Sequence, residues 1–465
     1  MTFLFLICVI CTLIYTVCAV RELYHKREFT GFLIASAMYD LVFGILPTTI
    51  VAQLLWDGDE VRFLQGILDL TSDGIYALIY YYLLAFLGFS ILYLSYHSKI
   101  HIRLKSIMNQ PREKVKRSKP TRNFLMLSWI SLLIGIISLY LWSSAYGSIF
   151  NLIVEANAVR SGVGSVTNSL AFFKHPARLV LICNFLFFAY LFKNKATKKQ
   201  LFQKIYGFTG LLIALSGSIL FLLANDGRLT IVLYILAILW LGIAGKKINH
   251  IQRTIVSGFG VICIALFLLN EMDSITHFIR FGDWIDNGKS IASSMIHELS
   301  FLPLGAQTSI LAGWNNEVGL TFFDDLITGL FAWFPSSLKP SGYEDVWSIN
   351  TILIWGDLSL SHGQYPCSFI TQAYYDLRVL GIILYSWGAG KVLKRIDQWS
   401  FDDSSLLTMS LKAVIMEFIL RGVAYFSFYD IVLSLFPIVI VIILNMGIQL
   451  MFSKRKITEK NKPYV

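Results

Sequence analysis

The stretch Thr2–Val20, with the sequence TFLFLICVICTLIYTVCAV, decides the fold class of this chain. It carries no charged residue, and a helix of this length, which rises about 1.5 Å per residue, crosses the hydrocarbon core of a bilayer. A cleavable signal peptide has its positive charges before the apolar stretch, whereas here they follow it from Arg21 onward. We therefore expect Thr2–Val20 to be a retained transmembrane helix.

Apolar runs of the same kind recur along the chain. The composition agrees, because 56% of the residues are hydrophobic and 15% are charged, whereas soluble domains contain about 25% charged residues. We predict an all-α integral membrane protein with about eleven transmembrane helices. They lie near residues 2–20, 32–56, 74–97, 124–142, 178–192, 205–224, 229–244, 254–270, 369–390, 404–424 and 430–452.

The basic residues indicate the orientation of these helices. Every second connection is basic: Arg21–Glu28, Lys99–Arg122, Lys193–Lys204, Lys246–Arg253, Lys391–Asp403 and the tail from Lys454 hold most of the 39 Lys and Arg residues. Since cytoplasmic loops carry the excess of positive charge, the N-terminus is predicted outside and the C-terminus in the cytoplasm. The net charge of +10 then reflects anchoring to anionic lipid, and no nucleic-acid partner is expected.

The spans divide the chain into four parts. Helices one to eight occupy residues 1–270, a large extracytoplasmic loop occupies 271–368, helices nine to eleven occupy 369–452, and a basic cytoplasmic tail occupies 453–465. Long loops are usually functional or disordered, and this one contains five tryptophans, so we expect it to be folded against the membrane. Apolar residues at helical spacing over 322–334, with Asp324 and Asp325 on the other side, predict a helix lying in the interface.

Several classes of site find no support in the sequence. The six cysteines show neither the spacing of a disulfide framework nor that of a metal site. No Walker loop, dinucleotide-binding glycine pattern or HExxH motif occurs, so neither a metal nor a cofactor is expected. No internal repeat is apparent, which counts against the duplicated bundles of many transporters.

Arginines near the outer surface are the first candidates for function. Arg228 ends a short turn between two apolar runs, Arg178 opens the fifth predicted helix, and Arg280 follows the eighth. A guanidinium binds phosphate oxygens through paired hydrogen bonds, so these arginines could share a phosphate or pyrophosphate site. The alternative is that each is an interfacial anchor that snorkels to the head groups, and convergence in space distinguishes the two readings.

The last three predicted helices carry further candidates. Arg378 shares helical spacing with Tyr374, Tyr375 and Thr371, which is typical of a polar wall that lines a cavity. Arg421 follows Glu417 by one turn, and this order favours a structural ion pair along the helix. His362, just before the ninth helix, could act as a general base, with Glu344, Asp345 and Asp357 as alternatives.

Three segments together resemble a known family. They are Trp333–Pro340, which contains a Lys-Pro pair, His362–Ser368, which contains a Pro-x-Ser element, and Tyr375, Asp376 and Gly381 in the helix that follows. With the short outer turn that ends in Arg228, they resemble the Wzy-type polymerases of O-antigen, capsule and exopolysaccharide repeat units. Asn225 and Asp226 replace the small residues usual in that turn, and Arg378 stands where many members have Gly.

The resemblance implies a GT-C-like fold and a metal-independent glycosyltransferase in the bacterial cytoplasmic (inner) membrane. It would act on undecaprenyl pyrophosphate-linked glycans, transfer the growing chain to a new repeat unit and release undecaprenyl pyrophosphate. Arg228, Arg280 and His362 would then be catalytic, and Arg178, Arg378, Arg421, Tyr375 and Asp376 would bind substrate. A flippase and a chain-length regulator are expected partners.

Two other functions remain open at this point. A GT-C transferase that uses a polyprenyl-phosphate sugar needs an acidic pair in an early outer loop, which Asp57, Asp59 and Glu60 could supply. A lipid-linked oligosaccharide flippase would place charges along its cavity at every depth, whereas the basic residues outside the cytoplasmic loops gather near the outer surface.

Overall fold

The computed structural model describes residues 1–26, 30–56, 68–98, 122–155, 169–193, 201–225, 299–331, 345–356, 365–398 and 406–460, with a few isolated positions between 234 and 284. Within these residues the fold is helical, and the one β-contact is a bridge between Cys367 and Phe426. The prediction of an all-α chain is therefore confirmed for the described residues.

Within the described residues, seven helices are long and apolar enough to cross a membrane, which indicates a multi-pass membrane protein. They are Thr2–His25, Gly31–Leu55, Ser72–His97, Asn123–Ser144, Leu170–Leu191, Leu201–Ala224 and Phe428–Met451. They coincide with the first six predicted spans and the eleventh. The ninth and tenth correspond to the more polar helices α18 (Phe369–Gln398) and α19 (Leu406–Ala424), and the seventh and eighth lie almost wholly outside the described residues.

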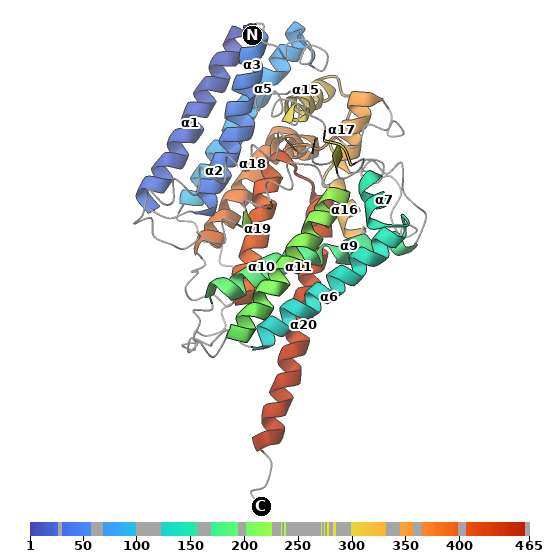
Figure 1. Cartoon of the computed structure of the whole chain (residues 1–465). Helices are drawn as coiled ribbons and strands as arrows, with labels where there is room; N and C mark the ends of the chain where they lie inside the picture. The colour runs from blue at the N-terminus through green and yellow to red at the C-terminus, as the bar shows by residue number, and fades with distance from the viewer. Residues whose placement is uncertain are drawn as a thin grey trace, which may run out of the picture.

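The N-terminal helices form a first bundle (Figure 1). It comprises α1 (Thr2–Lys26), α2 (Gly31–Asp40), α3 (Leu46–Leu55) and α5 (Ser72–His97), and α5 packs along α18 from the end of the chain. Aromatic rings fill the centre of this bundle: Tyr15, Phe32, Tyr39, Phe43 and Phe89 are almost completely buried. Large rings on facing helices thus hold the N-terminal helices together.

The second bundle contains the middle of the chain and its last helix. Its members are α6 (Arg122–Ser144), α7 (Ile149–Val154), α10 (Leu179–Lys193), α11 (Leu201–Asn225) and α20 (Phe428–Lys460). Helix α19 contributes Leu420 to the first core and Ala413 and Met416 to the second, so it belongs to both bundles.

A π-helix, η1 (Leu41–Ile45), interrupts the second predicted span between α2 and α3. Pro47 begins the first turn of α3 and has no N–H, so it cannot donate the helical bond to the carbonyl four residues earlier. A wider turn before the proline accommodates this loss.

The start of α2 is fixed by a distant residue, because Asp397 accepts hydrogen bonds from Gly31 N (2.6 Å), Phe32 N (3.2 Å) and Tyr96 Oη (2.9 Å).

The large loop is folded into helices where the structure describes it. Helices α15 (Phe301–Trp314), α16 (Asp324–Phe331) and α17 (Val346–Trp355) occupy it, and α16 confirms the helix predicted within 322–334. The position predicted for Asp325 is wrong, because its side chain is fully buried instead of facing water. It caps α20, accepting hydrogen bonds from Tyr429 N and from Ser427 Oγ, both at 3.1 Å.

Candidate functional site

Arg178 lies at the joint between α9 (Lys174–Ala177) and α10. Its N–H donates to the carbonyl of His175 (3.3 Å) and its own carbonyl accepts from Leu181 N (3.1 Å), so the chain passes through the joint as a tight turn. The guanidinium therefore stands at the start of α10, the end of a helix where the dipole disfavours a positive charge. Since the residue is 8% exposed, it needs acidic partners from other helices.

Arg421 stands in the last turn of α19, where the helix dipole favours a cation. Its Nε lies 3.4 Å from Oε1 of Glu417, one turn earlier, as the spacing of the two residues predicts. Both residues are buried. This pair neutralises one face of the guanidinium and leaves its two terminal nitrogens for other partners.

Asp430 joins the two arginines from the first turn of α20, where the helix dipole favours an acid. Its Oδ1 lies 3.3 Å from Nη2 of Arg178, and its Oδ2 lies 2.5 Å from Nη1 of Arg421. The two carboxylate oxygens are thus divided between two guanidinium groups. Helices α10, α19 and α20 meet at this one carboxylate.

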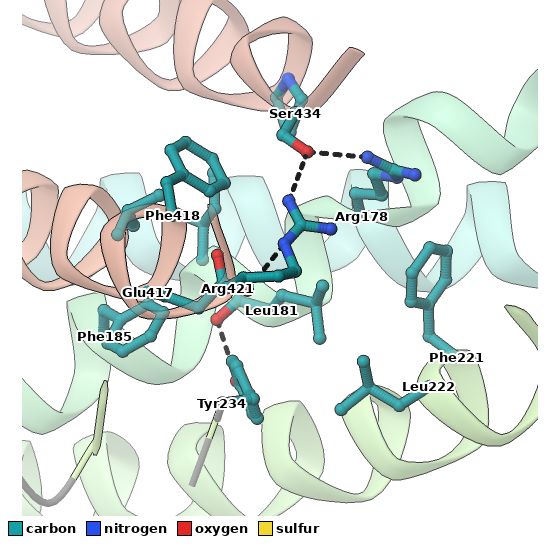
Figure 2. Close-up of a pocket in the computed structure, with 13 residues that line it drawn as sticks. Arg178, Leu181, Phe185, Phe221, Leu222, Tyr234, Glu417, Phe418, Arg421 and Ser434 are labelled. Carbon is teal, nitrogen blue, oxygen red and sulfur yellow. Dashed lines mark hydrogen bonds and ion pairs between the residues drawn. The ribbon is translucent and has the colours of Figure 1, made fainter. Parts of the chain in front are cut away.

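Ser434, one turn after Asp430, completes the junction. Its Oγ accepts hydrogen bonds from Nη1 of Arg178 (2.8 Å) and from Nη2 of Arg421 (3.2 Å), and Figure 2 shows both bonds converging on this oxygen. We call Arg178, Glu417, Arg421, Asp430 and Ser434 the arginine cluster.

The arginine cluster borders a small cavity with apolar walls (Figure 2). The cavity has a volume of about 40 Å³, enough for roughly three water molecules. Its walls are Leu181, Ile182, Phe185, Phe221, Leu222, Tyr234, Val414, Phe418 and Pro437, with Arg178, Glu417, Arg421 and Ser434 at its polar side. Because apolar walls exclude most water, charges at this site interact more strongly than they would at the protein surface.

The arginine cluster balances two positive charges against two negative ones. Lys174 adds a further positive charge, because it acts electrostatically on Asp430. Its ammonium also lies over the ring of Trp142, 5.9 Å from the centroid. One donor of the cluster is unused: Nε of Arg178 is buried and has no hydrogen-bond partner among the described residues. A group with additional acceptor oxygens would satisfy this donor.

A relay of hydrogen bonds fixes Asp430 to the large loop. Asp325 on α16 accepts from Ser427 Oγ, and the same hydroxyl oxygen accepts from Asp430 N (3.2 Å). Burial raises the pKa of Asp325 to about 7, and the nearby charge of Asp345 acts in the same direction. The loop helix and the acid that bridges the arginines are therefore mechanically connected.

A second polar centre surrounds a break in α18. The backbone departs from helical geometry at Leu377 (φ −144°, ψ 22°) and Arg378 (φ 54°, ψ −135°). Asp376, fully buried beside the break, accepts from Thr321 Oγ1 (2.5 Å), Phe323 N (3.1 Å), Gln372 Nε2 (3.2 Å) and the Tyr385 hydroxyl. We call Thr321, Phe323, Gln372, Asp376 and Tyr385 the helix-break cluster.

The break also redirects the side chain of Arg378. The polar face predicted from helical spacing is interrupted at Leu377, and Nη2 of Arg378 donates to the carbonyl of Val318 (2.6 Å). Its guanidinium also lies over the ring of Tyr374, 5.0 Å from the centroid. Arg378 therefore attaches the loop before α16 to α18.

Tyr375 is likewise engaged with protein groups. Its side chain is fully buried, and its hydroxyl donates to Oδ1 of Asn350 (3.2 Å). Its carbonyl, which the break releases from the helix ladder, accepts from Thr321 N (3.2 Å). Tyr375 and Asp376 thus hold the loop against α18.

The structure brings together two of the arginines singled out in the sequence, Arg178 and Arg421. Arg228, Arg280 and His362 lie outside the described residues. Sequence reasoning missed Asp430 and Ser434, although an acid in the first turn of an apolar span, followed one turn later by a hydroxyl, is a detectable signal.

Comparison with known proteins adds no relative. No family model matches the chain, and neither a curated protein nor a solved structure matches it.

Proposed function

We propose that this chain is a glycosyltransferase that polymerises lipid-linked oligosaccharide repeat units at the outer face of the bacterial cytoplasmic membrane. In this reaction a glycan leaves its undecaprenyl pyrophosphate carrier and joins a hydroxyl of a second lipid-linked unit. The bond from the sugar to the pyrophosphate breaks, and the acceptor loses a proton.

One observation carries the proposal: the guanidinium groups of Arg178 and Arg421, which are far apart in the sequence, converge beside an apolar cavity. The departing pyrophosphate gains negative charge in the transition state, and fixed cations in a water-poor site stabilise such charge strongly. Two planar guanidinium groups also match the geometry of phosphate oxygens better than two ammonium groups would.

Asp430 and Ser434 orient these cations before a substrate arrives. Without them, two like charges at the same point would repel each other and turn outward. With them, the guanidinium groups are held in place by bonds to one carboxylate and one hydroxyl. A pyrophosphate would exchange some of these bonds and engage Nε of Arg178, which has no partner among the described residues.

The finer features of the proposal rest on the family resemblance. They are a GT-C-like architecture, Arg228 and Arg280 as further pyrophosphate ligands, His362 as the general base, and a flippase and a chain-length regulator as partners. The proposed orientation, with an outer N-terminus and a cytoplasmic C-terminus, rests instead on the distribution of Lys and Arg.

The test measures the lengths of lipid-linked glycans in cells that lack this gene. Cells complemented with the wild type should make polymer, whereas cells with Arg178→Ala or Arg421→Ala should accumulate single repeat units on the outer face. Arg21→Ala, which changes an exposed arginine on α1, is the matched control and should restore polymer. Each variant is checked for membrane insertion.

The side on which single units accumulate separates the competing functions. Accumulation on the cytoplasmic face of the null strain would make the protein a flippase and overturn the polymerase. Polymer of normal length from both arginine variants, at normal protein levels, would remove the pyrophosphate role of the cluster.

A further inference from the structure

The first bundle contains a carboxyl group that the proposed function does not use. Asp40 is the last residue of α2 and directly precedes the π-helix. It is the tenth residue of a span that begins at Gly31, so it lies roughly 13 Å along the helix, near the middle of the hydrocarbon core. The side chain is 7% exposed.

Asp40 has fewer hydrogen-bond donors than Asp376 or Asp430. Thr16 Oγ1 lies 2.5 Å from its Oδ2, and its Oδ1 is buried without a partner among the described residues. By contrast, Asp376 has four donors and Asp430 has two guanidinium partners. An ionised carboxylate offers about four acceptor sites, and leaving most of them empty in an apolar medium is very costly.

The groups around Asp40 are neutral. Tyr15 from α1 interacts with it electrostatically, Cys11 lies next to Tyr15, and the ring of Tyr39 on α2 lies 5.8 Å from that of Tyr15. On α5, Tyr82 interacts electrostatically with Cys11. No lysine, arginine or histidine forms an ion pair with Asp40 within the described part of the chain, so no positive charge offsets an ionised carboxylate.

Gly44 makes room for the carboxyl group. A β-carbon at this position would lie 2.6 Å from Oδ1 of Asp40 and 2.9 Å from Oγ1 of Thr12, closer than atoms can pack. The hydroxyl of Thr12 is already engaged with the carbonyl of Cys8 (2.9 Å) and with Thr48 (3.2 Å). Oδ1 of Asp40 therefore lies beside Gly44, which offers no side-chain donor, and the nearby hydroxyl of Thr12 already has other hydrogen-bond partners.

We infer that Asp40, Thr16 and Gly44 form a proton-binding site within the membrane. A protonated carboxyl needs one acceptor, which Thr16 Oγ1 provides, and the remaining carbonyl oxygen tolerates a missing partner far better than a charged oxygen does. Thr16 is exposed on the surface of the first bundle, so the proton is reachable from the lipid side. The site does not depend on the proposed function.

The test is labelling of the full-length protein in membranes with dicyclohexylcarbodiimide, an apolar reagent that attacks protonated carboxyl groups. The acid O–H adds across one C=N bond, and an acyl shift then leaves an N-acylurea with no leaving group. Mass spectrometry should find the label on the peptide that contains Asp40 at neutral pH, and not on the one that contains Asp376. Above its midpoint, labelling should fall about tenfold per pH unit.

Two variants sharpen the result. Asp40→Asn should lose the label but keep wild-type expression and melting temperature, because the amide resembles the neutral acid. Thr16→Val removes a hydrogen bond from both forms of the carboxyl group. The ionised form loses more, because hydrogen bonds to charged groups are the stronger ones, so labelling should persist to higher pH. Absence of label on wild-type Asp40 at neutral pH overturns the proposal. A second outcome also overturns it: if sodium chloride prevents labelling and choline chloride at the same concentration does not, the site binds sodium ions instead of protons.

Discussion

The arginine cluster and the helix-break cluster are each centred on an aspartate, but the groups that bind the two aspartates differ in charge. Asp376 is surrounded by neutral donors, two hydroxyls, one amide side chain and one backbone N–H. Asp430 is bound by two guanidinium groups beside a cavity. The first arrangement satisfies one charge completely, whereas the second gathers several charges at one point.

From this difference we expect a structural role for the helix-break cluster and a functional one for the arginine cluster. Neutral donors around Asp376 hold a loop against a broken helix, and their four hydrogen bonds use the acceptor sites of the carboxylate that a ligand would need. Two cations beside a cavity cost more to bury than a hydrogen-bonded acid does, and in membrane proteins such a cost usually accompanies a function. We therefore expect substitutions at the two clusters to have different consequences.

The largest effect is expected for Arg421→Ala. It removes the guanidinium that pairs with Glu417 and with one oxygen of Asp430, which should lower the free energy of unfolding by about 3–5 kcal/mol, in addition to the loss of polymer. Denaturant unfolding in detergent micelles measures the change. The double variant with Asp430→Asn should lose less than the sum of the single losses, and strict additivity would show that the two side chains do not interact energetically.

The next effect concerns Asp325, which connects the loop to the arginine cluster. Its pKa is raised to about 7, so the folded state binds its proton more tightly than the unfolded state does. Its contribution to stability is present at low pH and is lost as the pH rises through 7. Between pH 4 and pH 8 the wild type should lose roughly 3–4 kcal/mol relative to Asp325→Asn. Parallel stability profiles for the two proteins would argue against a proton on Asp325.

A smaller effect is expected at the helix-break cluster. Tyr385→Phe removes one hydroxyl donor from Asp376, and hydrogen bonds to charged groups contribute about 1.5–3 kcal/mol. The melting temperature should fall, while glycan polymer per folded molecule should stay at the wild-type level. Loss of polymer without loss of stability would instead assign Asp376 to the reaction.

The smallest effect is expected for Ser434→Ala, which removes one hydroxyl from the arginine cluster and leaves all four charges. The stability should change by about 1 kcal/mol. Polymer should shorten rather than disappear, because both guanidinium groups keep Asp430. Gel analysis of the glycan lengths measures this change, and complete loss of polymer would give Ser434 a larger role than orientation.

The sequence predicts the apolar helices well, because a bilayer requires long uncharged runs. Within the described residues, seven of these runs are apolar helices long enough to span it, and two more coincide with the more polar helices α18 and α19. The sequence could also flag Arg178 and Arg421, since charges in such runs are rare. Their meeting at Asp430 could not be predicted, because it depends on how α10, α19 and α20 pack. The break at Leu377 and Arg378 has no local signal either, since neither proline nor glycine stands there and contacts from residues 318–323 impose it.

The bond between Gly31 and Asp397 has a consequence for the order of biosynthesis. The two residues are 366 positions apart, and a ribosome adding about 5–20 residues per second needs on the order of 20–70 s to make that length. During this time α2 is already synthesised, but the carboxylate that caps its first turn does not yet exist. The first bundle, although its own helices emerge first, is therefore completed only after α18, near the end of the chain, has been made.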